Sequence, residues 1–150
     1  MKPSFSQLLL GAASTLTQDI APQMKRAPAA QGQLGAIGLI LACAAQEADR
    51  AVETALIEQD ALRALFADAA LQPLTESLRM RLQAASLDHA RPSLKLSALE
   101  TQTTHLNALL MDLLEQVETE QFDWAIALEK RIWGMLKANA ERRALYLPVL

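Results

Sequence analysis

The residues best suited to chemistry form one charged group, made up of Glu47, Asp49, Arg50 and Glu53. Glu47 and Arg50 are three positions apart, so on a helix they can pair at its surface. If this segment were buried on all sides, the other carboxylates would need basic partners such as Arg142 or Arg143. We therefore expect a polar functional site here before anywhere else, with a solvated helix surface as the alternative.

Glycine recurs at every third position where the second helix is expected to begin, at Gly32, Gly35 and Gly38, a few residues after Lys25 and Arg26. Free N–H groups at a helix N-terminus bind anions, so Gly32, Gly35, Lys25 and Arg26 are a candidate anion site. Neither common phosphate-loop motif is present, because no strand precedes the glycines and no Lys-Ser/Thr pair follows them. Each helical glycine costs up to about 1 kcal/mol relative to alanine, which favours the alternative that another helix packs closely there.

Histidine and cysteine are rare in this chain, which has His89, His105 and Cys43. Glu100 precedes His105 by five positions, about 140° around a helix, so the Glu-x-x-His pattern of di-iron bundles is missing. Cys43 has apolar neighbours, where a thiol is usually a small buried hydrophobe and not a nucleophile. We therefore expect no catalytic residue, no metal site and no cofactor.

Composition narrows the class of protein. The 150 residues have a net charge of -3, which provides no positive field to hold nucleic acid by counterion release. Alanine and leucine are abundant and glycine and proline are few, so helix is favoured almost everywhere. This length predicts one domain, residues 1–150. The single cysteine, and an N-terminal apolar stretch shorter than that of a secretory signal, favour a cytoplasmic protein.

The most apolar segment is AIGLILACAA, residues 36–45, which is apolar or small on every side of a helix. A transmembrane helix needs about 20 apolar residues, whereas Gln33 and Gln46 bound this run, so we expect no association with a membrane. The run is instead predicted to be the central rod of a helical core, covered all round by other helices.

The second helix is also long. If it ran unbroken from Gly32 to Ala70, it would measure about 58 Å, against a radius of gyration of about 15 Å for a globule of this size. We therefore expect either a break near Glu58 to Asp60, or a continuous helix that projects and is covered by another chain.

The remaining helices follow from apolar residues spaced three and four apart. Ser4 is a predicted N-cap for a first helix that ends at Pro22, with one apolar face made of Phe5, Leu8, Leu9, Ala12, Leu16 and Ile20. A short helix is expected between Pro73 and Asp88. The clearest pattern predicts a packed helix with Leu96, Leu99, Thr103, Leu106, Leu110, Leu113 and Val117 on its inner face. A turn capped by Thr119 would separate it from a last helix that buries Ala125, Leu128, Ile132 and Leu136.

Several short segments resemble a family of uncharacterised, short, all-helical bacterial proteins. They are LLLGAASTL (8–16), Ile20-Ala21-Pro22, AAQEADRA (44–51) and ALRALF (61–66). Genes of this family often lie beside genes for aminoglycoside-phosphotransferase-like kinases and acyl-CoA dehydrogenases. The resemblance implies an accessory role in acyl-CoA or related catabolism, and it supplies no catalytic residue.

Together these patterns predict an all-α protein, an antiparallel bundle of four main helices with one or two short ones, around a long second helix. The favoured function is a non-enzymatic interaction or accessory protein that forms a dimer or docks on a metabolic enzyme. Its candidate partner surface is the apolar C-terminal tail, with Leu145, Tyr146, Leu147, Val149 and Leu150. The alternative is a bundle that binds a small acyl-type molecule in an apolar pocket between helices.

Overall fold

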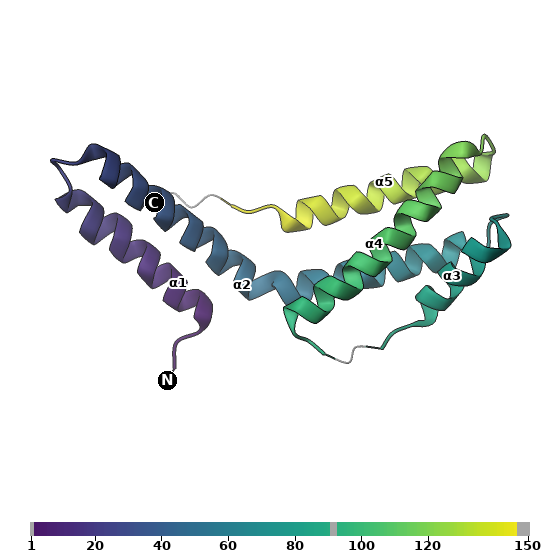
Figure 1. Cartoon of the computed structure of the whole chain (residues 1–150), viewed down its shortest axis with the longest axis horizontal. Coiled ribbons are helices and arrows are strands. Elements are labelled where there is room, and N and C mark those ends of the chain that lie inside the picture. The colour runs from purple at the N-terminus through teal and green to yellow at the C-terminus, as the bar shows by residue number, and fades with distance from the viewer. Residues whose placement is uncertain (1, 91–92, 147–150) are drawn as a thin grey trace. The chain divides into compact units, whose positions relative to one another are not determined.

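The computed structural model describes residues 2–90 and 93–146, and every regular element in these ranges is a helix (Figure 1). The α-helices are α1 (Phe5–Ser14), α2 (Pro28–Ala69), α3 (Glu76–Leu87), α4 (Leu96–Thr119) and α5 (Asp123–Arg143). A π-helix (Thr15–Ile20) and a 3₁₀ turn (Ala21–Gln23) connect α1 to α2. The predicted all-α class and long second helix are confirmed.

The helix ends agree only partly with the sequence patterns. Ser4 caps α1 through a capping box, in which its hydroxyl accepts from the Gln7 backbone and the Gln7 side chain accepts from the Ser4 backbone. α2 has no break at residues 58–60 and continues to Ala69, so the alternative of a broken helix is wrong. A turn does separate α4 from α5, but Thr119 is the last residue of α4 and donates to the Gln116 carbonyl.

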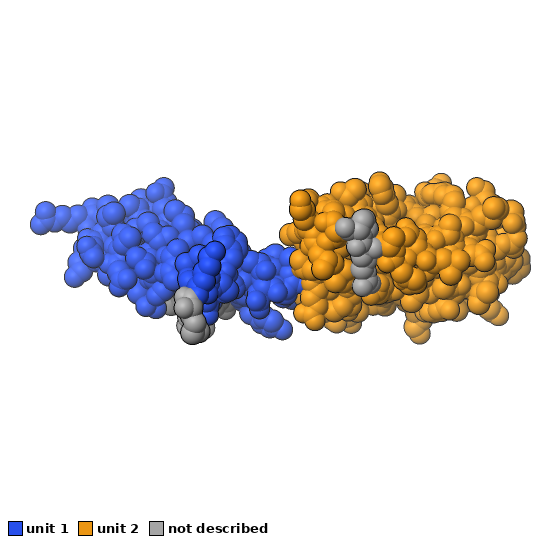
Figure 2. Space-filling model, turned by 90° about the horizontal axis from the view of Figure 1, so that it is seen from below, with its two compact units in different colours: residues 1–51, 144–150 blue, residues 52–143 orange. Residues whose placement is uncertain are grey.

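The chain divides into two compact units (Figure 2). Unit 1 comprises residues 1–51 and 144–150, and unit 2 comprises residues 52–143. α2 contributes residues 28–51 to unit 1 and residues 52–69 to unit 2. Whether the whole chain folds as one domain stays a prediction.

Unit 2 is built around large apolar side chains from α2, α3, α4 and α5. Phe66, Leu82, Leu113 and Ile132 are all fully buried, and each comes from a different one of these helices. The inner face predicted for α4 is confirmed from Leu99 to Val117, whereas Leu96, at the helix start, is exposed. Repeated steps of three and four placed these leucines on one side of α4, where the other helices cover them.

Unit 1 contains a helical hairpin of α1 and the first part of α2 (Figure 1). The residues buried in it are small. Its buried apolar residues, among those described, are the alanines Ala13, Ala21, Ala42, Ala45 and Ala51. Gly38 is also buried, and a Cβ atom there would lie 2.4 Å from Cγ2 of Thr17 and 3.5 Å from the Ala13 carbonyl oxygen. The close helix contact expected at Gly38 is therefore confirmed.

The apolar run 36–45 is not covered all round, so that prediction is wrong for the single chain. Ala42 and Ala45 are buried, but Ile37 is 45% exposed and Ile40 is 66% exposed. The predicted apolar face of the first helix fails in the same way, because Phe5, Leu8, Ala12 and Ile20 are exposed. Two helices can bury only the strip along which they touch, and small residues occupy that strip here.

Length and composition alone would also allow α2 to cross a membrane. Its most apolar 18-residue window has a mean hydropathy of 1.3, and 17% of that window is buried. A long apolar helix that is mostly exposed in the single chain is also found where a second protein covers it.

Candidate functional site

The predicted polar site lies on the α2 surface of unit 1, where it contacts the start of the C-terminal segment. The Gln46 amide makes two hydrogen bonds to Tyr146, donating to its carbonyl at 2.7 Å and accepting from its backbone N–H at 3.1 Å. Arg50 donates to the Ala144 carbonyl at 2.9 Å and pairs with Glu47 at 3.4 Å. The last carbonyls of a helix and those that follow it have no partner within the helix. Gln46 and Arg50 supply hydrogen-bond donors to such carbonyls in the segment that follows α5.

The four residues of this predicted site do not converge on one point. Glu47 and Asp49 are exposed in unit 1, Arg50 is half-buried, and Glu53 is exposed and belongs to unit 2. A pocket of about 330 Å³ lies beside Asp49 and Arg50, with Ser6 and Leu10 of α1 on its other side. The site is better described as an attachment point for the C-terminal segment than as a cluster of carboxylates.

The candidate partner surface on the tail is described only at its start. The side chains of Leu145 and Tyr146 are 44% and 78% exposed, because the contacts with α2 use the Tyr146 backbone. Leu147, Val149 and Leu150 lie outside the described residues.

The candidate anion site does not have the geometry that its prediction required. α2 begins at Pro28, four residues before Gly32, so Gly32 and Gly35 lie beyond the first helical turn and its free N–H groups. Lys25 and Arg26 are exposed in the connection before the helix. No atom lies within 4 Å of a Cβ built at Gly32 or Gly35, so the close packing expected at these two positions is wrong.

Unit 1 has an exposed stripe on α2, and its three central residues belong to the run 36–45 that was expected to be covered. Gln33, Ile37, Ile40, Ala44 and Glu47 follow one another at steps of four and three along α2, and all are exposed. We call these five residues the exposed stripe. Spacing of this kind lets a helix pair with another along its length. The sequence shows that residues 36–45 are apolar or small on every side of a helix, but this pattern does not tell which side the neighbouring helix covers.

Unit 2 buries charged and polar groups whose partners are distant in sequence. Glu58 is 3% exposed and accepts two hydrogen bonds from the Arg143 guanidinium, at 2.6 and 2.5 Å. Arg143 was one of two basic partners suggested for the carboxylates of the polar site if that site were buried, and the acid it binds here is Glu58. The Gln59 amide donates to the Leu99 carbonyl and to Thr103, while its own oxygen is buried without a partner.

The described residues contain no group of three or more His, Cys, Asp or Glu side chains that could hold a metal ion. His89 and His105 are both exposed, on different parts of unit 2. Cys43 is partly exposed, so the expectation of a buried thiol is wrong.

Comparison of the chain with protein-family models, with curated proteins and with solved structures finds no match. The functional inferences below therefore depend on the contacts, burial and charge of its own residues.

Proposed function

We propose that this chain is a non-enzymatic interaction protein that associates with a second copy of itself through the exposed stripe of α2 in unit 1. The observation that supports this proposal is the exposure of Ile37 and Ile40 at the centre of the stripe, on a hairpin whose own buried residues are alanines and Gly38. An alanine offers one methyl group, so burying it stabilises a fold much less than burying leucine or phenylalanine. The hairpin would gain most of its apolar burial from a partner.

The distribution of charge favours a second copy as that partner. Basic Lys25 and Arg26 precede the stripe, 12 and 11 residues before Ile37, and acidic Glu47 ends it, seven residues after Ile40. If two copies of α2 cross in opposite directions at the isoleucines, the basic end of each approaches Glu47 of the other. A two-fold axis uses the same surface on both subunits, which is the commonest symmetry of soluble dimers.

Pairing of two hairpins would bring four helix segments together, two from each chain. The dimer would then contain four helix segments in unit 1, with α1 and the first part of α2 supplied by each copy, in addition to the antiparallel bundle that the sequence predicts within one chain. An accessory role in a metabolic complex would follow from such a dimer, and the cytoplasm is its expected location.

The test is the mass of the full chain in solution, measured by light scattering and sedimentation. We expect twice the 16.4 kDa of one chain. Replacing both isoleucines (Ile37→Glu with Ile40→Glu) should weaken the dimer at least about tenfold, because central apolar contacts dominate interface energies. Ile126→Glu is the matched control, since Ile126 is 57% exposed but lies in unit 2.

Charge reversal tests the antiparallel arrangement separately. Lys25→Glu with Arg26→Glu should weaken the dimer, and so should Glu47→Lys, whereas a chain with all three changes should recover most of the affinity. A mass of one chain at about 100 μM would contradict the proposal, since a dissociation constant of about 10 μM would pair most chains there. Binding to lipid vesicles in place of self-association would contradict it as well.

A further inference from the structure

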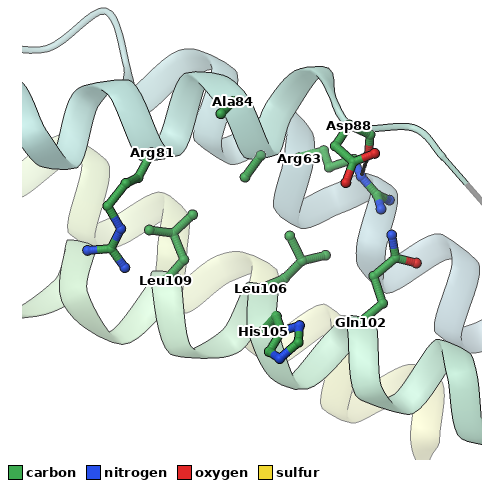
Figure 3. A pocket seen from close by; sticks show the side chains of 9 residues that line it. Arg63, Arg81, Ala84, Asp88, Gln102, His105, Leu106 and Leu109 are labelled. Atoms are coloured by element: carbon green, nitrogen blue, oxygen red, sulfur yellow. Dashed lines mark hydrogen bonds between the residues drawn. The ribbon is translucent and has the colours of Figure 1, made fainter.

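A pocket of about 350 Å³ lies within unit 2, between α3, α4 and the part of α2 that carries Arg63. Its apolar lining comes from Ala84 and Ala85 of α3 and Leu106 and Leu109 of α4. Figure 3 shows Arg63 and Gln102 at one end of this pocket, Arg81 at the other, and the two leucines between them. The volume is at the lower end of the range for small-molecule sites.

Arg63 is the unusual residue of this pocket, because its side chain is only 2% exposed. Its Nε donates to the Asp88 carbonyl at 2.6 Å, and Nη1 is 3.4 Å from an Asp60 carboxylate oxygen. Nη2 has no hydrogen-bond partner among the described residues. The Asp88 carbonyl lies at the C-terminus of α3, where carbonyls have no partner within the helix. Its hydrogen bond uses one of the five N–H donors of the arginine.

A buried guanidinium normally has its charge closely paired and most of its donors used. Here the acid that pairs with Arg63 is Asp60, at 3.4 Å through Nη1, and its side chain is 52% exposed. Arg63 therefore retains the capacity to bind an anion from the pocket side. The planar fork of a guanidinium matches a carboxylate, which it can hold with two parallel hydrogen bonds.

The charged groups around the pocket limit the ligand to at most one negative charge, because the Asp88 carboxylate also lines the pocket and Asp60 lies beside the Arg63 guanidinium. Arg81 pairs with Asp112 at 2.6 Å, so an acid of the protein already compensates its charge. His105 borders the pocket from α4 and is exposed. The space between the two arginines is lined by leucine and alanine and suits an apolar body.

We propose that the unit 2 pocket binds a small organic monocarboxylate, with the carboxylate on Arg63 and an aliphatic or aromatic body against Leu106 and Leu109. This site is independent of the self-association proposed for unit 1, because all of its residues belong to unit 2. It also defines a ligand class for the small-molecule alternative, in which the charged end matters as much as the apolar chain.

The experiment is a titration of the full chain followed by calorimetry and by the amide signals of Ala84, Leu106 and Leu109. Octanoate should bind, and octan-1-ol and acetate, which lack the charge or the apolar body, should bind at least tenfold more weakly. Octyl phosphate separates carboxylate from phosphate recognition. Tighter binding of octyl phosphate than of octanoate would overturn the assignment to carboxylates.

Two variants locate the site. Arg63→Gln should reduce octanoate affinity at least tenfold, and Arg131→Gln, at a surface ion pair with Asp68, is its control. Ala84→Leu should reduce affinity as much by filling the pocket from an exposed helical position, with Ala127→Leu on α5 as the matched control. Ala84→Leu decides the question if Arg63→Gln does not fold. Absence of octanoate binding at millimolar concentration, or binding unchanged in Ala84→Leu, would overturn the proposal.

Discussion

The two units of this chain use the same kind of secondary structure but bury different side chains. Unit 2 has a core of phenylalanine, leucine and isoleucine that comes from four helices, whereas the buried apolar residues described in unit 1 are alanines. Unit 1 also leaves Ile37 and Ile40 exposed, while Ile132 of unit 2 is fully buried. The difference shows that unit 2 buries its large apolar side chains within the chain, whereas unit 1 brings two helices close together through small residues and leaves its larger apolar side chains exposed.

Removing a large core side chain should have the greatest effect of any single change. Phe66 is fully buried in unit 2, and Phe66→Ala should lower the free energy of unfolding by about 3–5 kcal/mol because it leaves a cavity. Ala42→Gly, at a buried position of unit 1, should cost about 1 kcal/mol, mostly through helix propensity. Urea denaturation and amide hydrogen exchange measure both.

The control for this comparison is Phe122→Ala, since Phe122 is 63% exposed. It should change stability by less than about 0.5 kcal/mol. Equal losses for Phe66→Ala and Ala42→Gly would show that the units do not differ in the way proposed.

A methyl group added between α1 and α2 tests how closely unit 1 is packed. Gly38→Ala gains up to about 1 kcal/mol of helix propensity, but its Cβ would overlap Cγ2 of Thr17, and overpacking of this kind typically costs about 1–3 kcal/mol. We expect a net loss of about 1 kcal/mol, seen as faster amide exchange in α1.

Two further variants check the cause of that loss. Thr17→Ser removes the obstructing methyl while keeping a hydroxyl to donate to the Ala13 carbonyl, so it should rescue Gly38→Ala. Gly35→Ala, with no atom within 4 Å of its Cβ, should stabilise the chain. Failure of the rescue would mean that Gly38 is required for another reason.

The sequence was most informative where residue size varies sharply along a helix. In α4 the large residues recur at steps of three and four among polar ones, so the face from Leu99 to Val117 was predicted correctly. In the run 36–45 nearly every residue is apolar or small, so periodicity could not show which side faces α1. The actual contact depends on how Gly38 fits Thr17, which no pattern of hydrophobicity encodes.

The sequence indicated which residues belong to a candidate site, but not which distant residues they contact. The charged group near Arg50 was identified, yet its contacts with Ala144 and Tyr146 join residues far apart in the chain. Arg63 was missed entirely, because an arginine in a helix is usually solvated and the sequence gives no sign of its burial.

The ion pair of Glu58 with Arg143 should contribute a moderate share of unit 2 stability. Glu58→Gln should lower the free energy of unfolding by about 1–2 kcal/mol, less than for a fully buried pair, because the Arg143 side chain is 58% exposed and is screened by solvent. Asp68→Asn, at the exposed pair with Arg131, should cost less than about 0.5 kcal/mol. Thermal unfolding of both variants in low and high salt measures the difference, and equal costs would place Glu58 in an environment like that of the surface pair.

Apart from the surface controls, the smallest effect is expected at Gln59, the fully buried amide that faces α4. Its nitrogen donates to the Leu99 carbonyl and the Thr103 hydroxyl, but its oxygen has no partner, and a buried polar atom without a hydrogen bond costs about 1–3 kcal/mol. Gln59→Met has nearly the same shape and removes the unpaired oxygen, while Leu99 still accepts from Thr103 at 2.9 Å. Gain and loss should nearly cancel, so stability should change by less than about 1 kcal/mol in urea denaturation. A loss near that of Phe66→Ala would instead show that the amide oxygen has a partner, and that polar contacts, with apolar burial, define the core of unit 2.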